Sequence, residues 1–281
     1  MPGLVRLRAG DTDWAETDPL DAAPFVGDEN FTVYYGGSGV PVRLVWNVRN
    51  PLFSDKAIRQ ALTMAIDRRA LARALGYPDD TPISDGTYTS CQFERRDVPP
   101  AWPYDTVAAR QMLGTAGWID TDGDGIRERD GQPFRFVTIV SPRRERAGIF
   151  VQAQLARVGV RMEVQMLEYS VVYQRFVAGD FEAAIPRLPQ LKMRFGRPDA
   201  PNGYRNTRVQ ELVASISVAL DQEKAAPLFG ELAGIYYDEI PGTYLYPRLR
   251  AGIARRWIRG FVDGSGVAFP RVEQLWIERE Q

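Results

Sequence analysis

The stretch Asn47-Val48-Arg49-Asn50-Pro51-Leu52-Phe53-Ser54-Asp55-Lys56-Ala57-Ile58-Arg59-Gln60-Ala61-Leu62 carries the strongest local signal in the 281-residue chain. Ser54 and Asp55 are residue types that begin helices, because their side-chain oxygens accept hydrogen bonds from free backbone N–H groups. Apolar residues then recur at helical spacing, at Ala57, Ile58, Ala61, Leu62, Ala65 and Ile66. The pattern predicts one amphipathic helix over residues 54–75, which Gly76 and Pro78 end. Its polar face is expected to hold Lys56, Arg59, Gln60, Thr63 and Asp67.

The segments on either side alternate between strand and helix patterns. Residues 1–49 are expected to be irregular up to strands near 31–35 and 42–48, which the glycines of 36–39 separate as a flexible turn. A Pro-rich loop (78–103) then precedes a helix that Tyr104 and Asp105 begin and that ends near Gly117. Further strands are predicted at 134–140, 160–166, 181–185 and 243–253, and helices at 144–158, 170–178, 207–219 and 222–238. Such alternation is typical of an α/β fold with a mixed sheet that helices cover.

Composition restricts the chemistry available to the chain. It contains no histidine and one cysteine, Cys91, so Ser–His and Cys–His catalysis and Cys/His zinc sites are impossible within it. Lys plus Arg (35) nearly balances Asp plus Glu (36), which gives no electrostatic argument for nucleic acid as a partner. The apolar runs are too short to span a bilayer, and the N-terminus has no secretory signal pattern. These features are ordinary for a soluble globular protein, and they leave only carboxylate, Lys or Tyr chemistry for an enzyme.

The opening stretch, followed by Ala65-Ile66-Asp67-Arg68, resembles a hallmark of the family 5 extracellular solute-binding proteins, the dipeptide, oligopeptide and nickel receptors of ABC importers. Further segments resemble family landmarks in the same order, at residues 104–118, 120–131, 154–160, 178–184 and 257–261. The resemblance implies the C-terminal lobe of a two-lobed, periplasmic-binding-protein-like fold of type II, similar to dipeptide-binding proteins.

Members of that family are roughly twice as long, so the resemblance implies that this chain corresponds to their second half. Residues 1–49 are then expected to be strands of the first lobe and the crossover, residues 50–240 the C-terminal ligand-binding lobe, and residues 241–281 a segment that returns toward the first lobe. The N-terminal lobe and a signal peptide are expected upstream. The protein is accordingly expected to be periplasmic or otherwise extracytoplasmic, either soluble or tethered to the membrane.

The loop from Asp120 to Gly131 is a candidate calcium site. Asp120, Asp122 and Asp124 occupy alternate positions and Gly125 provides a sharp turn, as a calcium loop requires. However, Gly131 stands at the twelfth position, where such loops hold a bidentate glutamate. The alternative is an acidic turn whose carboxylates accept backbone hydrogen bonds. No other cofactor is expected.

The resemblance places ligand contacts in the loop around Tyr88 and in the segment after the strand at 181–185. Many relatives carry there a Tyr-Pro-Asp-Pro-like stretch whose aspartate pairs with the amino terminus of a peptide. This sequence departs from that pattern, because basic residues outnumber the one acid, Asp199. We therefore expect either a cleft for an anionic or carboxylate-bearing ligand, or a solvated surface loop. The candidate ligand-binding residues are Tyr88, Arg187, Asp199, Tyr204 and Arg205.

The leading hypothesis is the substrate-binding component of an ABC importer, lacking the N-terminal lobe, that binds a peptide or similar solute in an interlobe cleft by hinge closure. Its expected partners are the solute and, through the full-length protein, a membrane permease. We expect a monomer that does not bind nucleic acid. The second hypothesis is the ligand-sensing lobe of a cytoplasmic transcription regulator. The third is a carboxylate- or metal-dependent enzyme, which the absence of histidine disfavours.

Overall fold

The computed structural model describes residues 2–81, 83, 100–186, 195–219, 222–260 and 275–278. Its centre is a six-stranded sheet in the order β1-β8-β2-β7-β5-β6. The strands are β1 (Trp14–Thr17), β2 (Phe31–Trp46), β5 (Arg135–Val140), β6 (Arg161–Met166), β7 (Ala183–Ile185) and β8 (Gly242–Arg255). β5 pairs in parallel with β6 and β7, whereas β2 is antiparallel to β7 and β8. The predicted α/β class with a mixed sheet is therefore confirmed.

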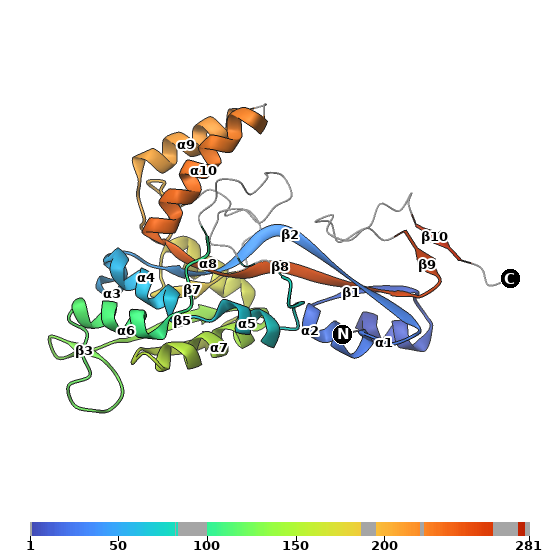
Figure 1. The fold of residues 1–281 in the computed structure, drawn as a ribbon, viewed down its shortest axis with the longest axis horizontal. Helices are drawn as coiled ribbons and strands as arrows, with labels where there is room; N and C mark the ends of the chain where they lie inside the picture. Colours follow the sequence, from blue (N-terminus) through green and yellow to red (C-terminus); the bar gives the residue numbers. More distant parts are fainter. Residues whose placement is uncertain are drawn as a thin grey trace.

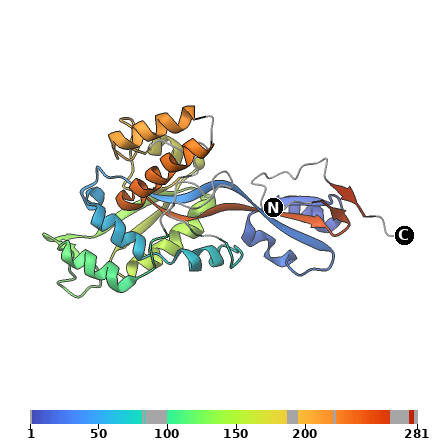
Figure 2. The same ribbon diagram turned by 45° about the horizontal axis from the view of Figure 1, so that its top comes forward.

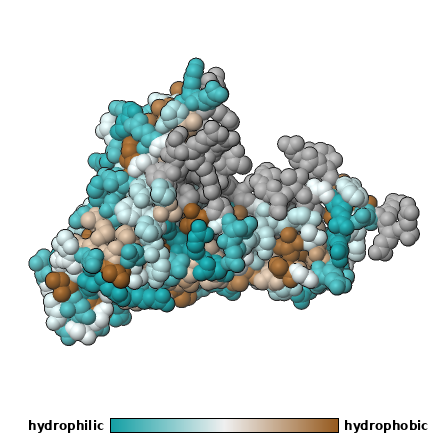
Figure 3. Space-filling view, viewed as in Figure 1, coloured by the Kyte–Doolittle hydropathy of each residue, from teal (hydrophilic) through white to brown (hydrophobic). Residues whose placement is uncertain are grey.

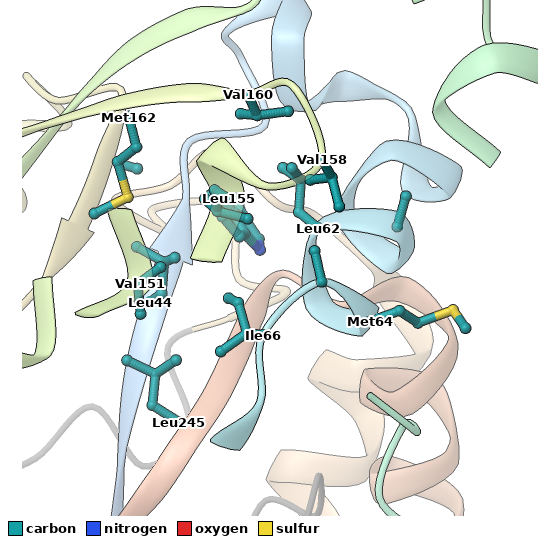
Figure 4. Close-up of a cluster of buried hydrophobic side chains, with 14 of the residues drawn as sticks. Leu44, Leu62, Met64, Ile66, Val151, Leu155, Val158, Val160, Met162 and Leu245 are labelled. Carbon is teal, nitrogen blue, oxygen red and sulfur yellow. The ribbon is translucent and has the colours of Figure 1, made fainter. Parts of the chain in front are cut away.

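Helices cover both faces of the sheet around β5, β6 and β7 (Figure 1). One face carries α3 (Pro51–Ser54), α4 (Lys56–Met64), α5 (Arg68–Ala74), α6 (Thr106–Thr115) and α7 (Glu145–Ala156). The other carries α8 (Tyr169–Ala178), α9 (Thr207–Val218) and α10 (Gln222–Glu239). Adjacent residues of a strand enter different cores, so that Leu44 packs in the first core and Val45 in the second. Figure 4 shows the first core, where β2, α4, α7, β6 and β8 contribute Leu44, Leu62, Val151, Met162 and Leu245.

β2 and β8 extend beyond this body as a twisted two-stranded ribbon (Figures 1 and 2). Around the far part of the ribbon lie α1 (Pro2–Ala9), β1, α2 (Pro19–Ala22) and the pair β9 (Ile258–Arg259) and β10 (Trp276–Ile277). A third, small core holds α1, β1 and α2 to the ribbon, with Leu7, Ala15, Ala22, Phe25, Ala251 and Ile253 buried in it. The molecule therefore has a large helical body and a smaller end that the ribbon joins. The predicted division of the chain at residues 49 and 240 stays a prediction.

The N-terminal part is more ordered than its sequence predicts. Residues 1–49 were expected to be irregular before the strands, but they contain α1, β1 and α2. The predicted turn at 36–39 is also wrong, because β2 continues through it and pairs Gly36 with Arg250 and Gly37 with Leu249. The reason is that β8 supplies a backbone partner along this whole length, which outweighs the local preference of glycine for turns. A register shift between Gly37 and Pro41 accommodates the irregular residues.

The helix predicted over 54–75 is broken into α4 and α5. Asp55 caps α4, where its side chain accepts a hydrogen bond from Ala57 N at 2.8 Å, which confirms one of the two predicted caps. Asp67 then caps α5, where it accepts a hydrogen bond from Ala70 N at 2.8 Å. Asp67 therefore begins a new helix instead of occupying the polar face of a longer one.

Arg59 and Thr63, predicted on the polar face of that helix, are buried, with 2% and 1% of their surface exposed. The guanidinium of Arg59 donates hydrogen bonds to the carbonyls of Phe53 (2.7 Å), Ser54 (3.0 Å), Glu239 (2.5 Å) and Ile240 (3.0 Å). Thr63 Oγ1 donates to Arg59 O at 2.9 Å and lies 2.6 Å from Thr243 Oγ1. The end of α10 and the start of β8 thus cover a helix face that the sequence pattern assigns to solvent, and hydrogen bonds satisfy its polar groups.

Substituting Arg59→Ala should lower the free energy of unfolding by about 3 kcal/mol or more, because buried carbonyls lose their donor. Urea denaturation followed by circular dichroism measures the change. Arg69→Ala, at an exposed position of α5, is the matched control and should change the stability by less than about 0.5 kcal/mol. Equal stabilities of the two variants would contradict the structural role of Arg59.

Candidate ligand-binding pocket

A pocket of about 360 Å³ lies where the helical body meets the ribbon. Its walls come from the start of α2, from residues 142–146 at the start of α7, from the segment after α5, and from β8. Five arginines line it, namely Arg143, Arg144, Arg146, Arg248 and Arg250. The carboxylates in its lining are Asp18, Asp21 and Glu145. The side chains around this pocket, which we call the arginine pocket, therefore carry an excess of positive charge.

The position of the arginine pocket follows from the strand order. β5 is parallel to both of its neighbours, and its last residue, Val140, is followed by Ser141, a short 3-10 helix (Pro142–Arg144) and α7. In open α/β sheets, ligands bind outside the carboxyl ends of the strands. The start of a helix also favours a negative charge, because its free N–H groups point toward that end. The sheet thus places Arg143 and Arg144 where an α/β protein ordinarily binds an anionic group.

A close approach of α2 to the end of α5 shapes one wall of the arginine pocket. Gly76 has a φ of +76°, and a Cβ at this position would lie 2.6 Å from the Cα of Leu20. Glycine is therefore required here both for its conformation and for its missing side chain. Leu20 and Leu75, which flank this approach, both line the pocket.

Two buried tyrosines and Arg144 form a second wall. The rings of Tyr77 and Tyr246 pack edge to face with their centroids 5.4 Å apart. Arg144 Nη1 donates to Tyr246 Oη at 3.1 Å, and Leu249 N donates to Tyr77 Oη at 3.4 Å. Burial raises the pKa of both tyrosines above the ordinary 10.0, so their hydroxyls keep their protons to a higher pH than an exposed tyrosine does. Arg144 Nε is buried and has no acceptor among the described residues, so this N–H donor of the guanidinium is not satisfied by them.

The other charged pairs at the pocket differ in how fully they are neutralised. Arg250 donates hydrogen bonds to both Glu16 and Asp18. Burial opposes the charge of Arg250, but the bonds to these carboxylates outweigh burial and raise its pKa. Arg143 Nη1 lies 3.8 Å from Asp18 Oδ1, at the outer limit of an ion pair, and its side chain is 55% exposed. Arg250 is therefore already neutralised by two carboxylates, whereas Arg143 is only weakly paired and is more available to an anionic ligand.

The structure places the predicted ligand-binding residues elsewhere or does not describe them. Tyr88 and Arg187 lie outside the described residues. Arg205 is exposed, and Asp199 is exposed and accepts a hydrogen bond from Arg197 Nε at 3.1 Å. Tyr204 is buried in the second core, where its hydroxyl accepts from Asn206 Nδ2 at 3.1 Å and burial raises its pKa to about 12. Asp199, Tyr204 and Arg205 do not line the arginine pocket, and their role in binding stays a prediction.

Sequence reasoning missed the arginines of the pocket. The run Arg143-Arg144-Glu145-Arg146 follows directly after the predicted strand at 134–140, and the rule about carboxyl ends of parallel strands would have singled it out. Arg248 and Arg250 carry no such local signal. They reach the pocket only because β8, more than 100 residues further along the chain, pairs beside β2.

The acidic loop between α6 and the hairpin of β3 (Glu128–Arg129) and β4 (Gln132–Pro133) brings the three predicted aspartates together. Oxygens of Asp120, Asp122, Asp124 and Glu128 lie within 4.8 Å of one another, and Glu128 is the member that sequence reasoning missed. The aspartates also accept hydrogen bonds from backbone N–H groups. Asp120 accepts from Gly123 N and Gly125 N, Asp122 accepts from Asp124 N, and Asp124 accepts from Ile126 N. These bonds are the ones that the acidic-turn alternative expects. Calcium binding stays a prediction.

The two tyrosines of the arginine pocket should make the protein less stable above pH 10. Their pKa is raised above the ordinary 10.0, so the folded state keeps two protons that the unfolded chain releases near pH 10. Their contribution is complete below pH 10 and is lost as the pH rises toward the folded pKa values. Between pH 9 and pH 11, Tyr77→Phe/Tyr246→Phe should lose about 2 kcal/mol less stability in urea than the exposed control Tyr104→Phe. Equal alkaline losses in the two variants would contradict this assignment.

The chain is similar in sequence to bacterial peptide-binding proteins. The oligopeptide-binding protein AppA of Bacillus subtilis is 26% identical over 267 residues, which cover 86% of this chain and 48% of AppA. Di/tripeptide-binding protein 2 of Pseudomonas aeruginosa is 22% identical over 282 residues, which cover 92% of this chain and 50% of that protein. The chain thus spans about half the length of these curated relatives. Among the described residues, no helix is both long and apolar enough to cross a membrane.

Solved structures share its fold. The structure of AppA from Bacillus subtilis in complex with a nonapeptide matches with a TM-score of 0.79 at 24% identity, over 98% of this chain and 58% of AppA. NikA from Brucella suis in complex with Fe(III)-EDTA matches with a TM-score of 0.79 at 18% identity, over 98% of this chain and 59% of NikA. The family described as bacterial extracellular solute-binding proteins, family 5 Middle, matches residues 3–190. The chain belongs to the bacterial extracellular solute-binding proteins of family 5.

Proposed function

We propose that this chain is the substrate-binding component of an ABC importer and that its arginine pocket holds an anionic group of the solute. The observation that carries the proposal is the set of five arginines, against three carboxylates, at the carboxyl end of β5. We favour a peptide, because the AppA structure holds a nonapeptide and a linear peptide ends in a carboxylate. An anionic metal chelate is the second candidate, because the NikA structure holds Fe(III)-EDTA, whose carboxylates offer arginine the same oxygens.

Binding would proceed without making or breaking a covalent bond. Arg143 and Arg144 would donate charge-assisted hydrogen bonds to the carboxylate, and the two tyrosines would form an amphipathic wall beside it. Because the helical body and the small end of the ribbon both contribute walls, bending of the ribbon would open or close the pocket. The absence of histidine from the chain removes the commonest general base, which supports a binding role over a catalytic one.

The proposal extends to location and partners. The family description as extracellular supports a periplasmic or other extracytoplasmic location, from which the loaded protein would deliver its solute to a membrane permease. We also propose a monomer. In its support, Figure 3 shows hydrophobic residues as small separate spots among hydrophilic ones on the face in view.

An NMR titration of the chain, which detects millimolar affinities, tests the proposal with trialanine as the free acid, trialanine as the C-terminal amide, and Fe(III)-EDTA. If the pocket binds the peptide carboxylate, the amide should bind at least tenfold more weakly, which corresponds to about 1.4 kcal/mol. Arg143→Ala should weaken binding of the free acid to a similar degree.

Arg175→Ala is the matched control, because Arg175 lies on α8 outside the pocket, and it should bind like the wild type. Preferential binding of Fe(III)-EDTA would assign the pocket to a chelate. Equal affinities for acid and amide, unchanged in Arg143→Ala, would refute the proposed role of the pocket.

A further inference from the structure

Three arginines in the described part of the chain are buried, and one of them differs from the others. Arg59, 2% exposed, donates to four backbone carbonyls, and Arg68, 4% exposed, donates to the carbonyl of Trp102. Arg43 in β2 is 8% exposed, and its buried Nε has no acceptor within the described ranges. Among the described residues, no hydrogen bond or ion pair reaches the Arg43 guanidinium. A buried cation without an acceptor is unfavourable, so this side chain needs a separate explanation.

Aromatic rings hold Arg43 in place. Its guanidinium carbon lies 4.6 Å from the centre of the Tyr244 ring and 5.6 Å from the centre of the Phe195 ring. A register shift in the β2–β8 ladder after Val42 places Tyr244 directly opposite Arg43. Phe195 is itself held by Tyr236, whose hydroxyl donates to Phe195 O at 3.0 Å. Cation–π contacts compensate only part of the lost hydration of a charged group.

The donor geometry of a guanidinium indicates which chemical group would bind to Arg43. The faces of the two rings offer no oxygen acceptor, so the N–H donors of the guanidinium, which lie in its plane and point outward from its edge, stay available for an oxyanion. Carboxylate and phosphate oxygens match that edge in geometry and in charge. Phe195 packs in the second core, whereas Tyr246 of the arginine pocket packs in the first core. Arg43 and the arginine pocket therefore belong to different faces of the sheet.

We propose that Arg43, framed by Tyr244 and Phe195, is a second anion-binding site, which takes a carboxylate or phosphate group of the solute. The inference rests on the proposed function in that the ligand is an anionic solute, but it uses none of the residues of the arginine pocket. It adds one anion-binding side chain on the face of the sheet away from the arginine pocket.

Thermal unfolding of the whole chain in sodium phosphate and in sodium acetate, with sodium chloride holding the ionic strength constant, tests the second site. In the wild type, at least one anion should raise the melting temperature in a saturable manner. In Arg43→Met, which keeps a long side chain between the rings without the charge, the apparent affinity for that anion should fall at least tenfold. Arg175→Ala should keep the wild-type response, since Arg175 lies on α8 and belongs to neither proposed site. The relative responses to phosphate and acetate distinguish the two kinds of oxyanion.

Two outcomes would overturn the inference. One is the absence of a saturable response in the wild type, and the other is an unchanged response in Arg43→Met. An anion response that Arg143→Ala abolishes and Arg43→Met keeps would support the arginine pocket alone. An anion response that Arg43→Met abolishes and Arg143→Ala keeps would support the second site. If Arg143→Ala also left peptide binding unchanged, the proposed role of the arginine pocket would be refuted while the second site stood. If Arg43→Met does not fold, NMR of the wild type replaces it. The arginine Nε–H signal of Arg43 is identified as the one that is missing in Arg43→Lys. This signal must shift in the wild type when the anion is added, and a signal that does not shift would contradict the inference.

Discussion

The guanidinium of Arg59 joins two parts of the chain that lie about 180 residues apart. It donates to carbonyls at the end of α3 and at the end of α10, where Ile240 turns with a φ of +41° into β8. β8 then forms half of the ribbon and supplies Tyr246, Arg248 and Arg250 to the arginine pocket. The start of β8, and with it the alignment of those pocket residues, therefore depends on a polar side chain that is buried and fully hydrogen-bonded.

Other residues of the hallmark stretch act in the same way. Asn47 Nδ2 donates to Gly179 O and Phe181 O, and Arg49 Nη2 donates to Pro201 O at 2.5 Å. These bonds attach the end of β2 to the segments before β7 and before α9. The stretch by which the family is recognised thus organises backbone carbonyls within the lobe, and the arginine pocket is lined by other residues. A sequence hallmark of this kind identifies the fold better than it identifies the ligand.

Local patterns predicted most helices and strands of the body. The helices α6 and α9 begin at the capping side chains of Asp105 and Asn206, and α7 and α10 show apolar residues at helical spacing. They failed where partners distant in the sequence decide the outcome. Gly36 and Gly37 remain in a strand because β8 lies beside them, and Arg59 is buried because α10 covers it. The arginine pocket assembles from α2, the start of α7 and β8, so no single window of sequence contains it. Glu128 joins the acidic loop through its antiparallel bridge to Ile119, which spacing alone does not indicate.

The arginines differ in how far the protein itself neutralises them, and this difference locates the expected ligand. Arg250 is paired with two carboxylates, Arg144 shares a tyrosine hydroxyl, and Arg43 has only aromatic contacts among the described residues. The central claim is that an anionic group of the solute binds at the carboxyl end of β5. A crystal structure of the chain with a bound peptide that carries a free carboxyl terminus tests it most directly. The account predicts carboxylate oxygens within hydrogen-bonding distance of Arg143 or Arg144, and a carboxylate held away from the arginine pocket would contradict it.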